Sequence, residues 1–277
     1  LANIKLNMIS KNSFNLDGKT IAITGANGLL GIEFTESIIE FGGKVIAIDI
    51  ASNNLEDKNF LNNDNLYFIN ADISDEIELT KRIENLSSDQ KTTVAGLVNC
   101  AAKDFIPSKS DENATREELF DLEEFRKTLD LNVTCQIVVT DIIAKLLIKN
   151  GGGSIINISS IYGLLSPKQE IYNHIVNDGE VYKKPLSYSV SKSALFNLTR
   201  HLGTLWAKNN IRVNTVTFGG VENNQDKEFI EKYSKNVPMG KMANTDDYSG
   251  IIIYLLSDNS KYVTGANFVI DGGWSSW

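Results

Sequence analysis

The sequence predicts a single-domain α/β fold, a doubly wound parallel sheet with helices on both faces. Short β-branched runs alternate with longer segments of helical periodicity from Lys19 onward. The short runs are almost wholly apolar, which is typical of parallel strands buried on both faces. A glycine-rich turn joins the first run to the first helical segment, as in sheets that bind ligands at their carboxyl edge. The 277 residues, 42% of them hydrophobic, are enough for one large core.

The expected elements follow one another without a linker. TIAIT, directly after Lys19, predicts the first strand, and IEFTESIIEFGG predicts the first helix, since its apolar residues have helical spacing and two glycines end it. We expect the later strands at 44–50, 65–74, 93–102, 153–160, 211–220 and 266–273. We expect the later helices at 75–86, 121–149, 186–208 and 247–258.

Domain boundaries and excursions follow from the same pass along the chain. Residues 1–18 are expected to form an N-terminal extension, and residues 19–277 the domain. Two polar stretches, 103–120 and 166–185, interrupt the alternation, so we expect surface excursions near the functional edge of the sheet.

The composition excludes several classes of protein. With 27 Lys and Arg against 35 Asp and Glu, the net charge of −8 disfavours nucleic acid and anionic membrane surfaces as partners. The apolar runs are too short to cross a bilayer, and the first twenty residues do not resemble a secretory signal, so we expect a cytoplasmic protein. Cys100 and Cys135 lack the spacing of a zinc site, which predicts two reduced thiols and no metal.

The turn TGANGLLG, residues 24–31, predicts a dinucleotide site of the Rossmann type. Glycines between a strand and a helix let the backbone approach a pyrophosphate, which then lies at the helix N-terminus. The legible strand before the turn and helix after it supply the context that this motif requires, although a tight turn without a ligand is the alternative. We expect cofactor contacts from Gly25, Asn27, Gly28, Leu29, Leu30 and Gly31.

Polar residues at three further strand ends extend this site. Asp49 ends the second strand, where a carboxylate can accept both hydroxyls of the adenosine ribose and would repel a 2′-phosphate, so NAD is favoured over NADP. A solvated strand end is the alternative for Asp49. Asp72 with Ile73, and Asn99 with Ala101, follow the third and fourth strands and are expected cofactor contacts, although each could be an ordinary turn residue.

YSVSK, Tyr188 to Lys192, is the strongest chemical signal in the sequence. Residues at i and i+4 share a helix face, so the Lys192 ammonium can lie close to the Tyr188 phenol. A cation there, together with a positive nicotinamide ring, would lower the phenol pKa from its usual ~10 toward neutrality and make the phenol a proton-transfer group. If this pentapeptide stood alone, an ordinary amphipathic helix surface with an incidental Tyr and Lys would be favoured.

These motifs together resemble the short-chain dehydrogenase/reductase family from about Lys19 to Gly273. The resemblance rests on the glycine turn, Asp72, the NCAA turn, NISS, YSVSK and the closing VTGANFVIDGG. It implies an NAD-dependent oxidoreductase whose catalytic group is Asn132, Ser160, Tyr188 and Lys192. It also implies cofactor contacts from Tyr188, Lys192, Gly219, Val221 and Asn223.

The implied roles agree with the chemistry of these side chains. Tyr188 would transfer the hydroxyl proton, Lys192 would hold the nicotinamide ribose, and Ser160 would hydrogen-bond the reacting oxygen. Asn132 would anchor a water. The turn departs from the family's oxidoreductase pattern because Leu29 replaces its middle glycine and Gly28 stands one place earlier, a spacing closer to sugar-nucleotide epimerases.

About fifteen residues are inserted between Ser160 and Tyr188 relative to the family. The insertion, 166–185, carries Lys168, Tyr172, His174, Lys183 and Lys184, and is expected either to be a solvated loop or to form a pocket wall suited to a hydroxylated or anionic substrate. Residues 221–237 would form the substrate lid. SSIYGLLSPKQEIY, the insertion and FGGVENNQ resemble, more narrowly, short-chain reductases of flagellin modification and nonulosonic-acid synthesis, which implies a sugar or sugar-phosphate substrate.

Three functions are therefore weighed. The first is an NAD-dependent interconversion of a secondary alcohol and a ketone on a polar, sugar-like small molecule. The alternatives are an idle NAD-binding sensor or scaffold, which the intact catalytic residues disfavour, and an epimerase or dehydratase. We also expect a homotetramer with Trp274 and Trp277 at one interface, since a terminal tryptophan is seldom left unpacked, or else with both rings folded back on their own subunit.

Overall fold

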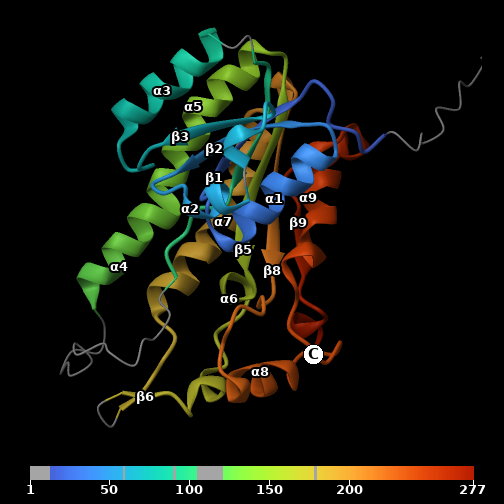
Figure 1. Ribbon diagram of the computed structural model, residues 1–277. Coiled ribbons are helices and arrows are strands. Elements are labelled where there is room, and N and C mark those ends of the chain that lie inside the picture. Colours follow the sequence, from blue (N-terminus) through green and yellow to red (C-terminus); the bar gives the residue numbers. More distant parts are fainter. Residues whose placement is uncertain (1–12, 59, 90–91, 105–120, 178–179) are drawn as a thin grey trace, which may run out of the picture.

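The computed structural model describes residues 13–58, 60–89, 92–104, 121–177 and 180–277 (Figure 1). Seven parallel strands form one sheet in the order β3-β2-β1-β4-β5-β8-β9. The strands are β1 (Thr20–Thr24), β2 (Lys44–Asp49), β3 (Leu66–Asn70), β4 (Val94–Asn99), β5 (Gly153–Ser160), β8 (Ile211–Phe218) and β9 (Asn267–Ile270). The predicted doubly wound α/β fold is confirmed.

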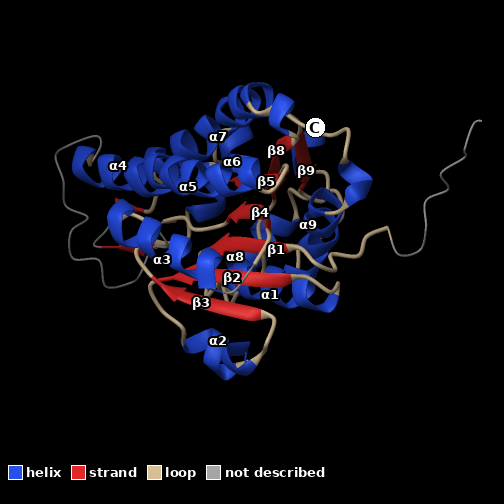
Figure 2. Ribbon diagram, turned by 90° about the horizontal axis from the view of Figure 1, so that it is seen from above, coloured by secondary structure: helices blue, strands red, loops and turns tan. Residues whose placement is uncertain are grey.

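Helices cover both faces of this sheet, as the view from above shows (Figure 2). One face carries α3, α5 and α7, and the other carries α1 and α9. The helices are α1 (Leu29–Glu40), α2 (Asn53–Asp57), α3 (Glu76–Asp89), α4 (Leu122–Leu129), α5 (Cys135–Lys149), α6 (Ile161–Leu164), α7 (Leu186–Leu205), α8 (Lys227–Ser234) and α9 (Ser249–Leu256).

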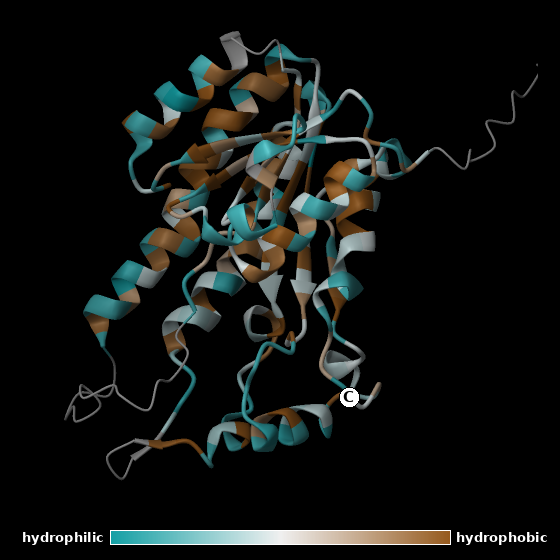
Figure 3. Cartoon of the chain, viewed as in Figure 1, coloured by the Kyte–Doolittle hydropathy of each residue, from teal (hydrophilic) through white to brown (hydrophobic). Residues whose placement is uncertain are grey.

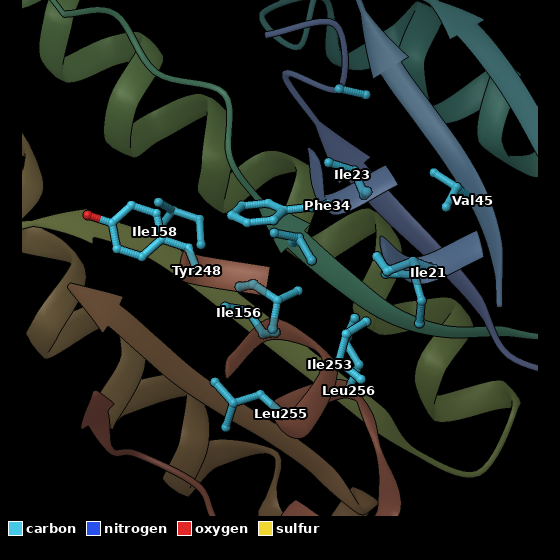
Figure 4. Packing of buried hydrophobic residues seen from close by; sticks show 14 of the residues in the cluster. Ile21, Ile23, Phe34, Val45, Ile156, Ile158, Tyr248, Ile253, Leu255 and Leu256 are labelled. Atoms are coloured by element: carbon cyan, nitrogen blue, oxygen red, sulfur yellow. The ribbon is translucent and has the colours of Figure 1, made fainter. Parts of the chain in front are cut away.

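Two apolar layers hold the sheet, one on each face. Figure 4 shows the first, in which Phe34 of α1 lies among sheet residues such as Ile23 and Ile156, with Leu255 of α9 nearby; all four are fully buried. The hydropathy colours place the apolar residues along the strands and the inner faces of the helices (Figure 3). Leu16, which the sequence assigns to the extension, is also buried in this layer; residues 1–12 lie outside the described part of the chain.

The long helix predicted at 121–149 is interrupted. A π-helical turn, Asp130–Thr134, separates α4 from α5. The whole stretch Leu122–Lys149 is long and apolar enough to cross a membrane by length and composition. In the fold, however, it is a core helix, because Val139, Ile143 and Leu147 are fully buried in the second apolar layer.

The insertion forms a small structure of its own beyond the carboxyl ends of the strands, next to α8 (Figure 1). A two-stranded antiparallel ribbon, β6 (Val176–Asn177) and β7 (Glu180–Val181), follows a 3₁₀ turn at Gln169–Tyr172. The other predicted excursion, 103–120, lies outside the described residues from 105 onward.

Candidate active site

Glycines shape the turn between β1 and α1. Gly25 has a φ of +67°, and a Cβ there would lie 2.7 Å from the Cα of Ala101. A Cβ on Gly31 would lie 2.0 Å from the carbonyl oxygen of Gly25. Both positions therefore require glycine. Gly25 brings the turn against the loop that follows β4, and Gly31 packs the start of α1 on the turn itself.

The start of α1 is open to an anion. Gly28 is the N-cap, and among the described residues no side chain caps the helix and no acidic residue occupies its first turn. The first N–H groups thus lack side-chain partners, while the helix dipole favours negative charge at this end. Leu29 is partly exposed beside these amides. The open helix end and the close-packed glycines fit a dinucleotide pyrophosphate.

Asp49 lies beside the turn at the end of β2. Its carboxylate accepts hydrogen bonds from the backbone N–H groups of Asn27, at 2.9 Å, and Ala51, at 3.2 Å. A carboxylate has further lone pairs that could accept from ribose hydroxyls. The Asn27 side chain is used differently, because it accepts from the backbone N–H groups of Asn54 and Leu55 and so ties the turn to α2.

Asp72 and Ile73 follow β3. Asp72 accepts the N–H of Ser74 at 2.8 Å, which shapes the loop toward α3. Ile73 is buried among the apolar residues beneath α5, so its main chain is what it can offer to a ligand.

Asn99 and Ala101 mark the end of β4. The buried Asn99 side chain donates to Thr140 at 2.8 Å and to Asn157 at 2.9 Å, which links the sheet to α5. The Ala101 N–H donates to the Thr24 hydroxyl at 3.2 Å. These bonds hold the loop after β4 against the glycine turn.

Gly219, Val221 and Asn223 follow β8 and line one cavity together with Leu30 of α1. The Gly219 carbonyl accepts the Tyr248 hydroxyl at 3.0 Å. The structure therefore brings these three residues to the same space as the start of α1.

Ser160, Tyr188 and Lys192 meet in this same cavity. Ser160 ends β5 and caps α6, where its hydroxyl oxygen accepts the N–H of Tyr162 at 3.2 Å. The Lys192 ammonium nitrogen lies 5.9 Å from the centre of the Tyr188 ring and donates to the Ile158 carbonyl at 2.9 Å. The i, i+4 spacing on α7 thus places both side chains on the face that meets the end of β5.

Ser159 and Gly163 set α6 and β5 against α7. The Ser159 hydroxyl donates to the Lys192 carbonyl at 2.9 Å, so it points away from Tyr188. A Cβ on Gly163 would lie 2.7 Å from the carbonyl carbon of Lys192. The sequence did not single out Gly163, since a glycine needed for close helix packing has no local signature.

Burial dominates the titration of the two central groups. It raises the pKa of the Tyr188 phenol, Asp104 adds to the rise, and a hydrogen bond from Ser160 opposes it. Burial therefore sets the direction of the shift in the free protein. The expected lowering requires a positive nicotinamide ring beside the phenol as well as Lys192, so it stays a prediction for the cofactor complex. Burial also lowers the pKa of Lys192 to about 8.

Asn132 lies in the π-helical turn between α4 and α5 and is fully buried. Its amide forms a closed pair with the backbone of Lys103, accepting the N–H at 2.7 Å and donating to the carbonyl at 2.9 Å. It also donates to the Ser191 hydroxyl at 3.0 Å. Asn132 thus joins α7 to the loop after β4, and π-helical turns of this kind are frequent at functional sites.

The cavity measures about 520 Å³ and extends from the glycine turn to the insertion. Its far wall is aromatic. The Tyr172 hydroxyl donates to that of Tyr162 at 3.0 Å, and the Tyr233 hydroxyl accepts the Gly220 N–H at 2.5 Å. The aromatic residues of this far wall are Tyr162, Tyr172, Tyr182, Phe229 and Tyr233.

The insertion packs on α8 and on the Asp226 cap of this helix. The Tyr172 ring lies 5.5 Å from that of Phe229 in α8. His174 Nε2 lies 3.0 Å from the carboxylate of Asp226, which caps α8 by accepting the Phe229 N–H. Lys168 donates to Asn236 at 2.6 Å. Of the five insertion residues singled out in the sequence, Tyr172 and Lys184 line the cavity, and Lys183 lines a neighbouring one.

The two terminal tryptophans differ in burial. Trp274 is buried and stacks on Tyr233 at 4.5 Å, whereas Trp277 is 79% exposed. One ring therefore folds back on its own subunit and the other stays available at the surface.

Both cysteines are free, and burial raises the pKa of Cys100 to about 11. Among the described residues, the structure contains no group of three or more His, Cys, Asp or Glu side chains that could hold a metal.

Comparison with known proteins shows which family has this sequence. A family model described as enoyl-(acyl carrier protein) reductase matches residues 25–275. The post-translational flagellin modification protein A of Campylobacter coli is 32% identical over 267 residues, covering 94% of this chain and 99% of that protein. The NADH-dependent L-xylulose reductase of Ambrosiozyma monospora is 28% identical over 287 residues, covering 96% of this chain and 98% of that protein.

A solved structure has the same fold. The short chain dehydrogenase of Leptospira borgpetersenii with bound NAD⁺ superposes with a TM-score of 0.81 at 28% identity, covering 97% of each chain. Other structures with this fold hold NADP. The resemblance to flagellin-modification enzymes is confirmed by the Campylobacter relative. The family match over nearly the whole chain, together with the meeting of the glycine turn, serine, tyrosine and lysine in one cavity, shows that the chain belongs to the short-chain dehydrogenase/reductase family.

Proposed function

We propose that this chain is an NAD(H)-dependent oxidoreductase that interconverts a ketone and a secondary alcohol on a sugar-like metabolite. The observation that carries the proposal is the single cavity that holds Ser160, Tyr188 and the buried Lys192 and reaches Leu30 at the start of α1. The proposed proton-transfer group, Tyr188, and the proposed hydrogen-bond donor, Ser160, thus line the same cavity as the start of α1, where the dinucleotide would bind.

NADH, bound at the glycine turn with Asp49 at its ribose, would supply a hydride. The chain's own residues do the rest. Ser160 donates a hydrogen bond to the reacting carbonyl oxygen, and Tyr188 gives that oxygen its phenolic proton, so that ketone, hydride and proton make an alcohol. Burial keeps the phenol protonated, which is the form needed for reduction. Lys192 helps to hold the nicotinamide ribose and stabilises the phenolate left behind.

Asn132 has a positioning role in this proposal. Because its amide clamps Lys103 and Ser191, it fixes the loop after β4 relative to the helix that carries Tyr188. The remaining cofactor contacts are proposed for Asp72, Ile73, Asn99, Ala101, Gly219, Val221 and Asn223.

The sugar-like substrate is supported by the aromatic wall and by the relatives. Ring faces held by internal hydrogen bonds suit the apolar faces of a sugar ring. Among the relatives, the L-xylulose reductase is named for a ketose. The narrower resemblance to flagellin-modification reductases also implies a sugar substrate.

The reaction is tested by following NADH oxidation with a panel of ketoses. Substrate-dependent loss of NADH absorbance is expected for the wild type. If the enzyme binds NADH and oxidises it with none of the panel, a sensor or scaffold takes the place of this proposal.

We also propose a cytoplasmic homotetramer. Two free cysteines suit a reducing compartment. The exposed Trp277 beside β9 supports an interface there. Light scattering of the wild type and of a chain truncated after Gly273 tests this, and a wild-type monomer at micromolar concentration refutes it.

A further inference from the structure

The insertion brings a second lysine to the catalytic tyrosine. The Lys184 ammonium nitrogen lies 4.8 Å from the centre of the Tyr188 ring, closer than that of Lys192, and its side chain is only 8% exposed. It contacts the carboxylate of Asp104 at 2.5 Å. This ion pair joins residues eighty positions apart and lies beside the reacting phenol.

Separate hydrogen bonds hold Lys184 and the backbone next to Asp104 in place. The Lys184 N–H donates to the Gln169 side chain at 2.9 Å, and the Gln169 amide donates back to the Lys184 carbonyl at 3.3 Å. Asp104 follows Lys103, whose backbone is clamped by Asn132. The position of the pair is therefore fixed from two sides of the cavity.

The pair supplies polar groups that the aromatic wall does not. The Tyr172 hydroxyl donates to that of Tyr162, and the Tyr233 hydroxyl accepts a backbone N–H, so these hydroxyls are partly engaged within the wall and bring no charge to a ligand. The Asp104 side chain is 38% exposed, which leaves lone pairs open to the cavity.

The charges around the cavity balance. Among the residues that the structure describes, its charged lining residues are Lys184, Lys192, Asp104 and Asp226, two cations and two anions. Lys184 is already compensated by Asp104, so a phosphate or carboxylate placed there would meet a carboxylate at close range. A hydroxyl, in contrast, can accept from the ammonium and donate to the carboxylate at once.

We propose that Lys184 and Asp104 form a specificity site that binds a hydroxyl group on the carbon next to the reacting carbonyl, so that the substrate is an uncharged α-hydroxy ketone and the product a vicinal diol. This inference rests on the proposed oxidoreductase function. It assigns the insertion the task of selecting the substrate, while Ser160, Tyr188 and Lys192 keep the chemistry.

The test compares matched ketones on the NADH-saturated enzyme. Binding of 2-hydroxycyclohexanone and of cyclohexanone is measured by ligand-observed NMR, and reduction by NADH absorbance. We expect the wild type to bind the hydroxy ketone at least about tenfold more tightly, as a hydrogen bond to a charged group allows. Lys184→Met and Asp104→Asn should each reduce this ratio to less than about threefold. Lys183→Met, a change at the exposed neighbouring lysine, should keep it.

The outcomes separate the inference from the function on which it rests. Unchanged ratios in Lys184→Met and Asp104→Asn would mean that the pair only anchors the insertion, and failure of the wild type to bind the hydroxy ketone would equally overturn the inference. Tighter binding of xylulose 5-phosphate than of xylulose would show that the site selects an anion instead. Selective binding that Lys184→Met abolishes, without hydride transfer to any ketone, would support the specificity site and refute the oxidoreductase function. NADH affinity, measured by fluorescence, should be unchanged in all three variants and reports that each is folded.

Discussion

The two sides of the cavity are built from different parts of the chain. On the cofactor side, the backbone defines the shape, because Gly25 and Gly31 leave no room for a Cβ and the amides at the start of α1 face outward. On the substrate side, side chains from distant segments define it, as Tyr172 of the insertion packs on Phe229 of α8 and Trp274 of the tail stacks on Tyr233.

This difference explains how one fold can keep a cofactor and change its substrate. A site whose shape is set by the backbone tolerates few substitutions at its glycines, but it depends on few side chains elsewhere. A site made by side chains of the insertion and of α8 can be altered one residue at a time without disturbing the sheet. The following variants test whether the two sides are as separable as the structure indicates.

The largest separation is expected for the hydroxyl of Tyr188, to which we assign the proton transfer. Tyr188→Phe should reduce turnover by about 10²–10⁴-fold, because it removes the proton donor and leaves the ring in place. NADH affinity, measured by fluorescence titration, should be nearly unchanged. Turnover within a few-fold of the wild type would refute the catalytic assignment.

Burying the Lys192 ammonium should lower the free energy of unfolding, although the proposed function needs this charge. Burial lowers the pKa of Lys192 to about 8, from 10.5, so the unfolded chain binds more protons between these values and stability rises with pH across this window. Below pH 8 the folded protein bears the whole cost of the buried charge. Lys192→Met should therefore raise the free energy of unfolding at pH 7 by roughly 2 kcal/mol, after loss of the bond to Ile158, while turnover falls.

Chemical denaturation at several pH values checks this. The stability difference between Lys192→Met and the wild type should narrow as the pH rises from 8 toward 10.5. A variant that is less stable than the wild type at pH 7 would contradict the account.

Asp49 tests the cofactor side. Its carboxylate should favour NADH over NADPH, because a 2′-phosphate would meet it as a like charge. Asp49→Ala should narrow the ratio of the two dissociation constants by about tenfold, chiefly through tighter NADPH binding. Equal affinities in the wild type would show that this side selects its cofactor by other means.

The smallest effect is expected on the substrate side. Tyr172→Phe removes the hydroxyl bond to Tyr162 and should lower the free energy of unfolding by about 1 kcal/mol. NADH affinity should not change if the two sides are separable. Tyr262→Phe, at a fully exposed ring, is the matched control and should change neither quantity.

Local patterns predicted the fold well, and they predicted which residues stand at the glycine turn and at the strand ends. The bounds of β5 agree with the expected strand at both ends, and β8 begins where expected, because apolar strands with glycine or polar ends are legible in the chain. Tyr188 and Lys192 could be paired because residues four positions apart on a helix lie on the same face. The interruption between α4 and α5 was not predicted, since it depends on the tertiary bonds of Asn132.

The substrate side was beyond such patterns. The Asp104–Lys184 pair spans eighty residues, and the aromatic wall comes from α6, the insertion and α8, so nothing local signals their meeting. The Asn27 side chain illustrates the same limit, because its bonds to α2 depend on how that helix packs. For Tyr188, the sequence showed the neighbouring cation but not the depth of burial, which decides the direction of the pKa shift.

The central claim is that this cavity transfers a hydride to a carbonyl carbon under the control of Tyr188. It is tested most directly by incubating the enzyme with NADH deuterated at the transferable position of the nicotinamide and a panel of hydroxylated ketones, and analysing the products by mass spectrometry. The account predicts one deuterium on the new alcohol carbon with the wild type, and deuterated product formed about 10²–10⁴-fold more slowly with Tyr188→Phe. Equal deuterium transfer by the two proteins, or none by a wild type that binds both NADH and ketone, would contradict it.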